Sequence, residues 1–155
     1  MLDVSDIRLE IVRASEEDVD RIVPLFDQYR AFYKERPDPE GARSFLTTRL
    51  ARNESVVFLA VAHDLGAVGF IQLYPSFSST SMNRLWILND LFVLPAARKR
   101  GVGEALMKRA EEFARQTNAK GLELETWIDN FSAQRLYEKC GWRRNQEFYQ
   151  YTLYL

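Results

Sequence analysis

The alternation of apolar and polar positions at the start of the chain predicts one strand followed by two helices. Residues 7–13 alternate with the two-residue period of a half-buried strand. Apolar residues then recur at helical spacing over residues 19–33, with Ser15 placed to cap the helix and Pro24 placed to kink it. A second amphipathic pattern predicts a helix over residues 40–52.

Three continuous apolar runs in the middle of the chain predict buried strands. They cover residues 55–62, 67–74 and 84–93, and the first is rich in β-branched residues. Asp and Gly in residues 63–66 predict a hairpin turn, and the Ser-rich stretch 76–82 predicts a loop. The middle of the chain should therefore form the centre of a sheet.

The remaining pattern predicts a helix, a strand, a short helix and a last strand. The clearest amphipathic helix follows Gly103, and residues 121–127 alternate as a strand does. A short helix should begin after Asp129 or Asn130, and residues 148–155 alternate aromatic and polar side chains as a closing strand. Without repeats or linkers, this order predicts one mixed α/β domain.

Composition narrows the possible functions. The 155 residues, 46% of them hydrophobic, suffice for one core, and 21 Lys and Arg against 22 Asp and Glu exclude the basic face that nucleic-acid binding needs. One Cys and one His exclude an internal disulfide and a zinc site. The first 20 residues carry seven acidic side chains, and no apolar stretch approaches a membrane span. We therefore expect a soluble cytoplasmic protein without a metal, a nucleic-acid partner or a membrane.

A basic, glycine-containing loop lies between a predicted strand and the N-terminus of a predicted helix. It reads Arg98-Lys99-Arg100-Gly101-Val102-Gly103. Free backbone N–H groups and the positive end of the helix dipole favour an anion at such a place, and glycines allow it to approach closely. A diphosphate is the predicted ligand. Alone, the string is more typical of an ordinary glycine turn flanked by solvated cations, and it is neither a Walker loop nor a dinucleotide fingerprint.

Two stretches in register resemble the GNAT superfamily of N-acetyltransferases. They are Asn89-Asp90-Leu91-Phe92-Val93 with the loop 98–103, and Asn130-x-x-Ala133-x-x-Leu136-Tyr137-Glu138-Lys139-Cys140-Gly141-Trp142. These motifs cover residues 87–142, and the predicted element order matches the family over nearly the whole chain. The resemblance implies an α/β fold with a mixed, mostly antiparallel central sheet flanked by helices. It also implies a single N-acetyltransferase domain over residues 1–155 with acetyl-CoA as co-substrate.

The same resemblance implies which residues bind the coenzyme. Backbone groups of Leu91, Phe92 and Val93 would pair with the pantetheine arm as an additional strand would. The diphosphate would be held by the backbone amides of Arg98, Lys99, Arg100, Gly101, Val102 and Gly103. In the second motif, Asn130 would contact the arm, Ala133 would leave room for it, and Tyr137 would face the sulfur.

Acetyl transfer to an amine needs an acid for the departing thiolate and an acceptor for the ammonium proton. A tyrosine of pKa about 10 can protonate a thiolate whose acid form has a pKa of about 8.5, so Tyr137 is the candidate acid. The alternative is that Tyr137 is a core aromatic residue. Asp90 is the candidate base, directly or through water, although it could equally be a structural hydrogen-bond acceptor. Glu125 on the neighbouring predicted strand is the reserve candidate.

Aromatic residues in the first half of the chain are candidates for the acceptor site, because aromatic faces attract cations. They are Tyr29, Phe32, Tyr33, Tyr74 and Phe77. They could also be core residues. Glu125 is grouped with them as a candidate substrate contact, and Glu35 or Asp38 could add negative charge.

The sequence leaves several alternatives open. The acceptor could be a small molecule, a polyamine, an amino acid or a protein lysine, and a bulkier acyl group could replace acetyl. A non-catalytic acyl-CoA-binding sensor is the alternative function. The aromatic last strand could support a homodimer, whereas His63 and Cys140 are expected to be structural.

Overall fold

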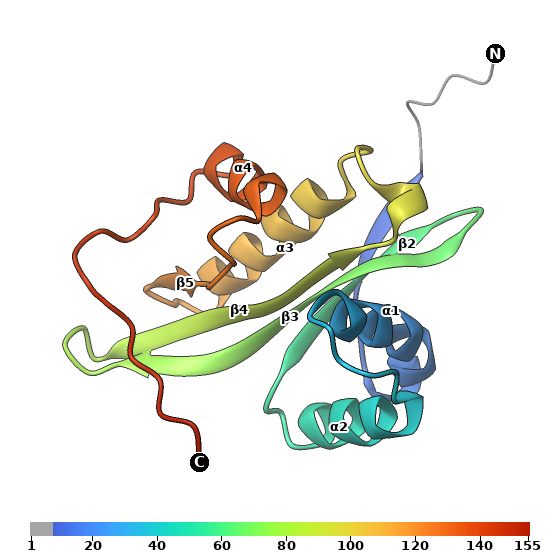
Figure 1. Cartoon of the computed structure of the whole chain (residues 1–155), viewed down its shortest axis with the longest axis horizontal. Coiled ribbons are helices and arrows are strands. Elements are labelled where there is room, and N and C mark those ends of the chain that lie inside the picture. Colours follow the sequence, from blue (N-terminus) through green and yellow to red (C-terminus); the bar gives the residue numbers. More distant parts are fainter. Residues whose placement is uncertain (1–7) are drawn as a thin grey trace. The chain divides into compact units, whose positions relative to one another are not determined.

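A computed structural model of the chain describes residues 8–155 (Figure 1). The first residue of the predicted opening strand, Ile7, lies outside this range. The chain divides into two compact units, Met1–Glu125 and Thr126–Leu155. They are described here in turn.

The first unit is built on a five-stranded sheet with the order β1-β2-β3-β4-β5. The strands are β1 Leu9–Arg13, β2 Val56–Ala62, β3 Gly66–Ser78, β4 Asn83–Val93 and β5 Gly121–Glu123. Strands β1 to β4 pair antiparallel with their neighbours, and β5 pairs parallel with β4. The expected mixed, mostly antiparallel sheet is confirmed.

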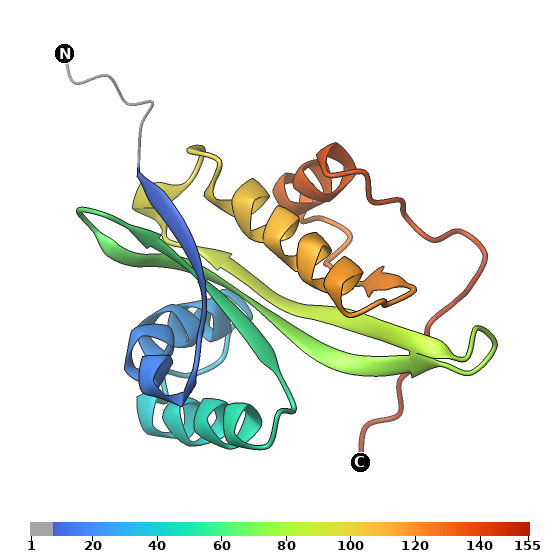
Figure 2. The same cartoon turned by 180° about the vertical axis from the view of Figure 1, so that it is seen from behind.

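Three helices flank this sheet. They are α1 Val19–Phe32, α2 Pro39–Ala51 and α3 Val102–Gln116. Helices α1 and α2 cover one face and α3 covers the other (Figures 1 and 2). Ser15 precedes a 3-10 turn over Glu16–Asp18 that leads into α1, so the helix begins near the predicted capping residue. Pro24 lies inside α1, which continues past it to Phe32.

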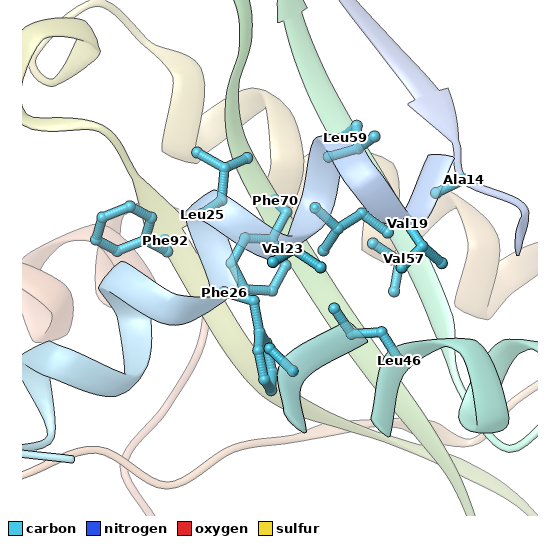
Figure 3. Packing of buried hydrophobic residues seen from close by; sticks show 12 residues of the cluster. Ala14, Val19, Val23, Leu25, Phe26, Leu46, Val57, Leu59, Phe70 and Phe92 are labelled. Atoms are coloured by element: carbon cyan, nitrogen blue, oxygen red, sulfur yellow. The ribbon is translucent and has the colours of Figure 1, made fainter. Parts of the chain in front are cut away.

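Two apolar layers explain why β2 reads as one continuous hydrophobic run. On one face, Val57 and Leu59 belong to a cluster with α1 and α2 that includes the fully buried Leu46 (Figure 3). On the other face, the Phe58 ring lies 5.6 Å from the ring of Phe113 on α3. Because helices cover both faces, successive residues of β2 are buried alternately on either side.

The second unit contains one helix, α4 Phe131–Lys139. Of the two predicted capping residues, Asn130 takes the role, since its Oδ1 accepts the Ala133 N–H at 3.2 Å. Gly141 ends the helix at φ 86°, a left-handed conformation that favours glycine.

Three predicted elements differ in the structure. Strand β3 extends to Ser78 through most of the predicted loop, because residues 76–78 pair with 83–85 of β4 and leave a turn at 79–82. The strand predicted over residues 121–127 is shorter in the structure, where β5 ends at Glu123 and pairs only with Leu85 to Ile87 of β4. The predicted last strand over 148–155 is not formed. Its apolar side chains are exposed, and the described second unit offers no strand with which it could form a ladder.

Candidate active site

The connection from β4 to α3 presents backbone N–H groups at its turn. Gly101 caps α3 with φ 78°, a conformation that costs other residues about 1–2 kcal/mol. The Ala105 N–H donates to the Gly101 carbonyl at 3.0 Å. The N–H groups of Val102 and Gly103 precede this bond, so the helix offers them no acceptor. The Arg98 N–H, which was also predicted to hold the anion, instead donates to the Pro95 carbonyl at 3.3 Å.

The three basic side chains of the loop are placed differently from one another. Arg98 turns back towards β4, where its Nε donates to the Val93 carbonyl at 2.9 Å and its guanidinium lies 5.7 Å from the Phe92 ring centroid. Lys99 and Arg100 are exposed. Arg98 therefore joins the loop to the end of β4, while the other two cations extend into solvent.

A β-bulge interrupts β4 at Asn89. Gln72 of β3 pairs with Asp90 and Leu73 pairs with Leu88, so Asn89 has no partner on β3. Its backbone carbonyl accepts a hydrogen bond from the Tyr29 hydroxyl at 2.9 Å instead. A bulge redirects the residues beside it, and this one lies next to the candidate base Asp90.

Asp90 is buried, with 1% of its surface exposed. Its carboxylate accepts hydrogen bonds from Gln72 Nε2 and from Asn89 Nδ2, the second at 2.7 Å. Burial raises the pKa of Asp90 above its ordinary value, and the hydrogen bonds from Asn89 and Gln72 only partly oppose this. A carboxylate in this environment takes up a proton more readily than one in water.

A cavity of about 410 Å³ opens between α1, α2 and the adjacent strands. Tyr29, Tyr74, Asn89 and Asp90 contribute to its lining, together with Phe26, Arg30, Asp38, Gly41, Ala42 and Phe45. Burial raises the pKa of both Tyr29 and Tyr74 above the ordinary tyrosine value, so both hydroxyls stay protonated at neutral pH.

The cavity collects only part of the predicted acceptor site. Tyr29 and Tyr74 line it. Tyr33 is not part of the lining, but its ring centroid lies 5.0 Å from that of Tyr29. Phe32 contacts Tyr33 in turn, at 5.3 Å. The other two candidates are not in the lining either, since Phe77 is 71% exposed at the far end of β3 and Glu125 is exposed beyond β5.

Sequence reasoning missed several residues of this site. Gln72 is fully buried against Asp90, and a polar residue between Ile71 and Leu73 in an apolar strand was the available signal. Half of the cavity lining was not predicted either, namely Phe26, Arg30, Gly41, Ala42 and Phe45.

The predicted residues of the second motif lie in the second unit. Asn130 Oδ1 is engaged in capping α4, and Ala133 is the residue whose N–H it accepts. Tyr137 is partly buried, with its ring 6.2 Å from that of Trp142. Replacing Tyr137 by phenylalanine would keep this ring contact.

The described residues offer neither a metal site nor a membrane span. Within residues 8–155, no group of three or more His, Cys, Asp or Glu side chains is arranged to hold a metal ion. Over the same range, every helix falls short of the length and apolar character needed to cross a membrane.

Comparison with known proteins adds to this geometry. The sequence pattern of the Acetyltransferase (GNAT) family matches residues 22–142. An uncharacterized N-acetyltransferase of Bacillus subtilis, YhfO, is 45% identical over 145 residues, which are 94% of this chain and 97% of the relative. The crystal structure of a probable acetyltransferase matches with a TM-score of 0.89 at 46% identity, over 94% of this chain and 97% of the other.

A more distant relative has a named acceptor. The aminoalkylphosphonate N-acetyltransferase of Salmonella typhimurium is 29% identical over 136 residues, which are 88% of this chain and 86% of the relative. The family match and the 45% identity to YhfO show that the chain is an acyltransferase that belongs to the GNAT family of acetyltransferases.

Proposed function

We propose that the protein transfers an acetyl group from acetyl-CoA to a primary amine by direct attack in a ternary complex. The connection from β4 to α3 carries this proposal. Its left-handed Gly101 precedes a 15-residue helix whose first N–H groups have no acceptor within the helix. Lys99 and Arg100 add exposed positive charge beside them. These features suit the diphosphate of the coenzyme, whose thioester supplies the acetyl group.

Asp90 is the proposed proton acceptor. An alkylammonium must lose its proton before it can attack, and Asp90 lines the cavity with a pKa that burial raises. The neutral hydroxyls of Tyr29 and Tyr74 add hydrogen-bond donors to the same cavity. Glu125 is the reserve candidate, although its exposure and its absence from the lining favour Asp90.

Tyr137 is the proposed acid for the departing thiolate. The support is its place in the second GNAT motif and the ordinary tyrosine pKa of about 10, which lies above that of a thiol. Asn130 and Ala133 are proposed to contact the coenzyme arm on the same basis. Leu91, Phe92 and Val93 are proposed to pair with that arm through their backbone groups.

Two assays test this function. Titration calorimetry with CoA tests coenzyme binding, and thiol release from acetyl-CoA over a panel of amines tests transfer. We expect binding together with thiol release that depends on the acceptor. Binding without such release would support the alternative of a coenzyme sensor, and the absence of both would refute the proposal.

The acceptor itself is proposed to be a small molecule. The cavity volume of about 410 Å³ lies in the lower part of the range of small-molecule sites, and the Salmonella relative is named for an aminoalkylphosphonate, which is a small molecule although it carries an anionic group. A cytoplasmic location, which the single cysteine favours, and a homodimer are further parts of the proposal.

A further inference from the structure

The charges around the acceptor cavity indicate which amines it accepts. We propose that the acceptor is a compact ammonium compound with no anionic group beside its amine, held between the carboxylates of Asp38 and Asp90. Amines formed by decarboxylation of α-amino acids have this chemistry, whereas the α-amines of the amino acids themselves do not. This inference rests on the proposed acetyl transfer and names its substrate class.

Two carboxylates line the cavity from different elements. Asp90 lies on β4 and is almost fully buried, whereas Asp38 precedes α2 and is exposed. Asp38 Oδ1 accepts the Gly41 N–H at 2.9 Å, which fixes the carboxylate at the start of α2. Gly41 gives it room, since a Cβ at this position would lie 2.2 Å from Asp38 Oδ2.

Among the described residues that line the cavity, Arg30 is the one cation, and its charge is already neutralised. Its Nη1 lies 3.5 Å from the Asp27 carboxylate and donates to the Arg36 carbonyl at 2.9 Å. Its Nη2 lies 4.0 Å from the Glu35 carboxylate. An anionic substituent entering the cavity would therefore meet two carboxylates and an arginine that other groups already bind.

A second arginine lies near the cavity, but it does not change the net negative charge of the lining. Arg49 lies over the Phe45 ring at 5.1 Å, and its Nε is 2.6 Å from Glu54 Oε2. Its charge is thus also paired with a carboxylate. The lining remains negative overall, which favours an ammonium and disfavours a carboxylate or phosphonate through like-charge repulsion.

Aromatic side chains form the apolar part of the lining. The rings of Phe26 and Phe45 stack with their centroids 5.9 Å apart and an interplanar angle of 16°. The ring centroid of Tyr29 lies 6.4 Å from that of Phe26. Aromatic faces attract an ammonium and bury flat or aliphatic groups attached to it. Carboxylates beside aromatic walls therefore suit a small organic cation.

The test compares three acceptors that differ in one group. Tyramine, tyrosine and tyrosine methyl ester share the same ring and amine, but only tyrosine carries a carboxylate, and the ester matches its bulk. We expect kcat/KM for tyramine and for the ester to exceed that for tyrosine by about tenfold or more. Isoamylamine against leucine repeats the comparison for aliphatic amines, with the acetylated product identified by mass spectrometry.

The Asp38→Asn variant links the preference to the cavity. Asparagine also caps helices well, so α2 should be retained while one negative charge is lost. We expect the preference for tyramine over tyrosine to fall by several-fold in this variant. It should be unchanged in the control Asp64→Asn, which removes an exposed carboxylate from the turn between β2 and β3.

The possible failures are distinguishable. Equal or better use of tyrosine and leucine, with coenzyme binding intact, would overturn the inference and leave acetyl transfer standing. An ester as poor as tyrosine would show that size, not charge, decides, and would also overturn it. CoA binding without acetylation of any of these amines would likewise overturn it, whereas failure to bind CoA would refute the proposed function itself.

Discussion

The hydroxyl of Tyr29 on α1 donates a hydrogen bond of 2.9 Å to the backbone carbonyl of Asn89 on β4, 60 residues further along the chain. Asn89 is the bulged residue, so this carbonyl has no partner on β3. Asp90 follows directly and lines the cavity together with Tyr29. One hydrogen bond therefore connects the helix beside the acceptor cavity to the bulge that orients the candidate base.

Replacing Tyr29 by phenylalanine should loosen this bulge. The change keeps the ring but removes the hydroxyl, so we expect the free energy of unfolding to fall by about 1 kcal/mol, the usual net worth of one hydrogen bond. Turnover should fall while CoA affinity stays close to that of the wild type, because Tyr29 lies apart from the β4 to α3 loop. Urea unfolding, steady-state kinetics and calorimetry check this. Tyr151→Phe, at a residue 91% exposed, is the matched control.

Asp90 should make stability depend on pH. Burial raises the pKa of Asp90 in the folded protein, so the folded state binds its proton more tightly than the unfolded chain does. The stabilising contribution of the protonated form is present below the unfolded pKa of about 3.9 and is lost as pH rises through the folded pKa. The wild type should therefore lose stability relative to Asp90→Asn as pH rises.

Urea unfolding between about pH 4 and pH 8 measures this difference. The neighbours of Asp90 do not contribute to this pH dependence. Tyr29 and Tyr74 stay protonated in this range, and Gln72 and Asn89 do not titrate. Asp64→Asn, at an exposed carboxylate, provides the control. A stability difference between Asp90→Asn and the wild type that is constant with pH would contradict the assigned environment.

Most of the fold could be predicted from hydrophobic periodicity, and the exceptions depend on pairing between distant residues. β2 was predictable because helices bury both of its faces, as Val57 and Phe58 show. The extension of β3 to Ser78 was not, because its pairing with Asn83 overrides the turn preference of serine. Residues 148–155 alternate with the period of a strand, but a strand also needs a neighbouring strand with which to form hydrogen bonds.

Local backbone geometry around the candidate site could be predicted in part. Asn130, one of the two predicted capping residues, caps α4, whereas the left-handed conformation of Gly101 was not predicted. The bulge at Asn89 and the contact between Gln72 and Asp90 could not be predicted, because both depend on the register between β3 and β4. A hydrophobicity pattern fixes which face a residue takes but not which residue it opposes.

Replacing Tyr137 by phenylalanine should separate turnover from coenzyme binding. The ring can keep its contact with Trp142, so α4 should be retained, but the proposed proton donor is lost. We expect kcat to fall by about 100-fold, the lower end of the range for general acid catalysis, with CoA affinity within about twofold of the wild type. Thiol release under saturating acetyl-CoA measures kcat. Tyr149→Phe, at a residue 92% exposed in the same unit, should leave it unchanged, and undiminished turnover in Tyr137→Phe would defeat the assignment.

Gly101 allows the proposed diphosphate site to be tested apart from stability. Gly101 and Gly66 have nearly the same backbone angle, φ 78° and φ 73°, and a Cβ added at either would meet no atom within 4 Å. Substitution by alanine at either position should therefore lower the free energy of unfolding by a similar amount, about 1 kcal/mol, because alanine disfavours the left-handed conformation.

Only Gly101 precedes the helix whose first N–H groups are proposed to bind the diphosphate. A Cβ there would narrow the approach of an anion to the Val102 and Gly103 amides, whereas Gly66 is the first residue of β3, next to the turn from β2. We expect Gly101→Ala to weaken CoA binding by about tenfold, and Gly66→Ala to leave it unchanged at equal loss of stability. Equal CoA affinities for the two variants in calorimetry would mean that the start of α3 does not hold the diphosphate, because the two changes differ only in where the methyl group is placed.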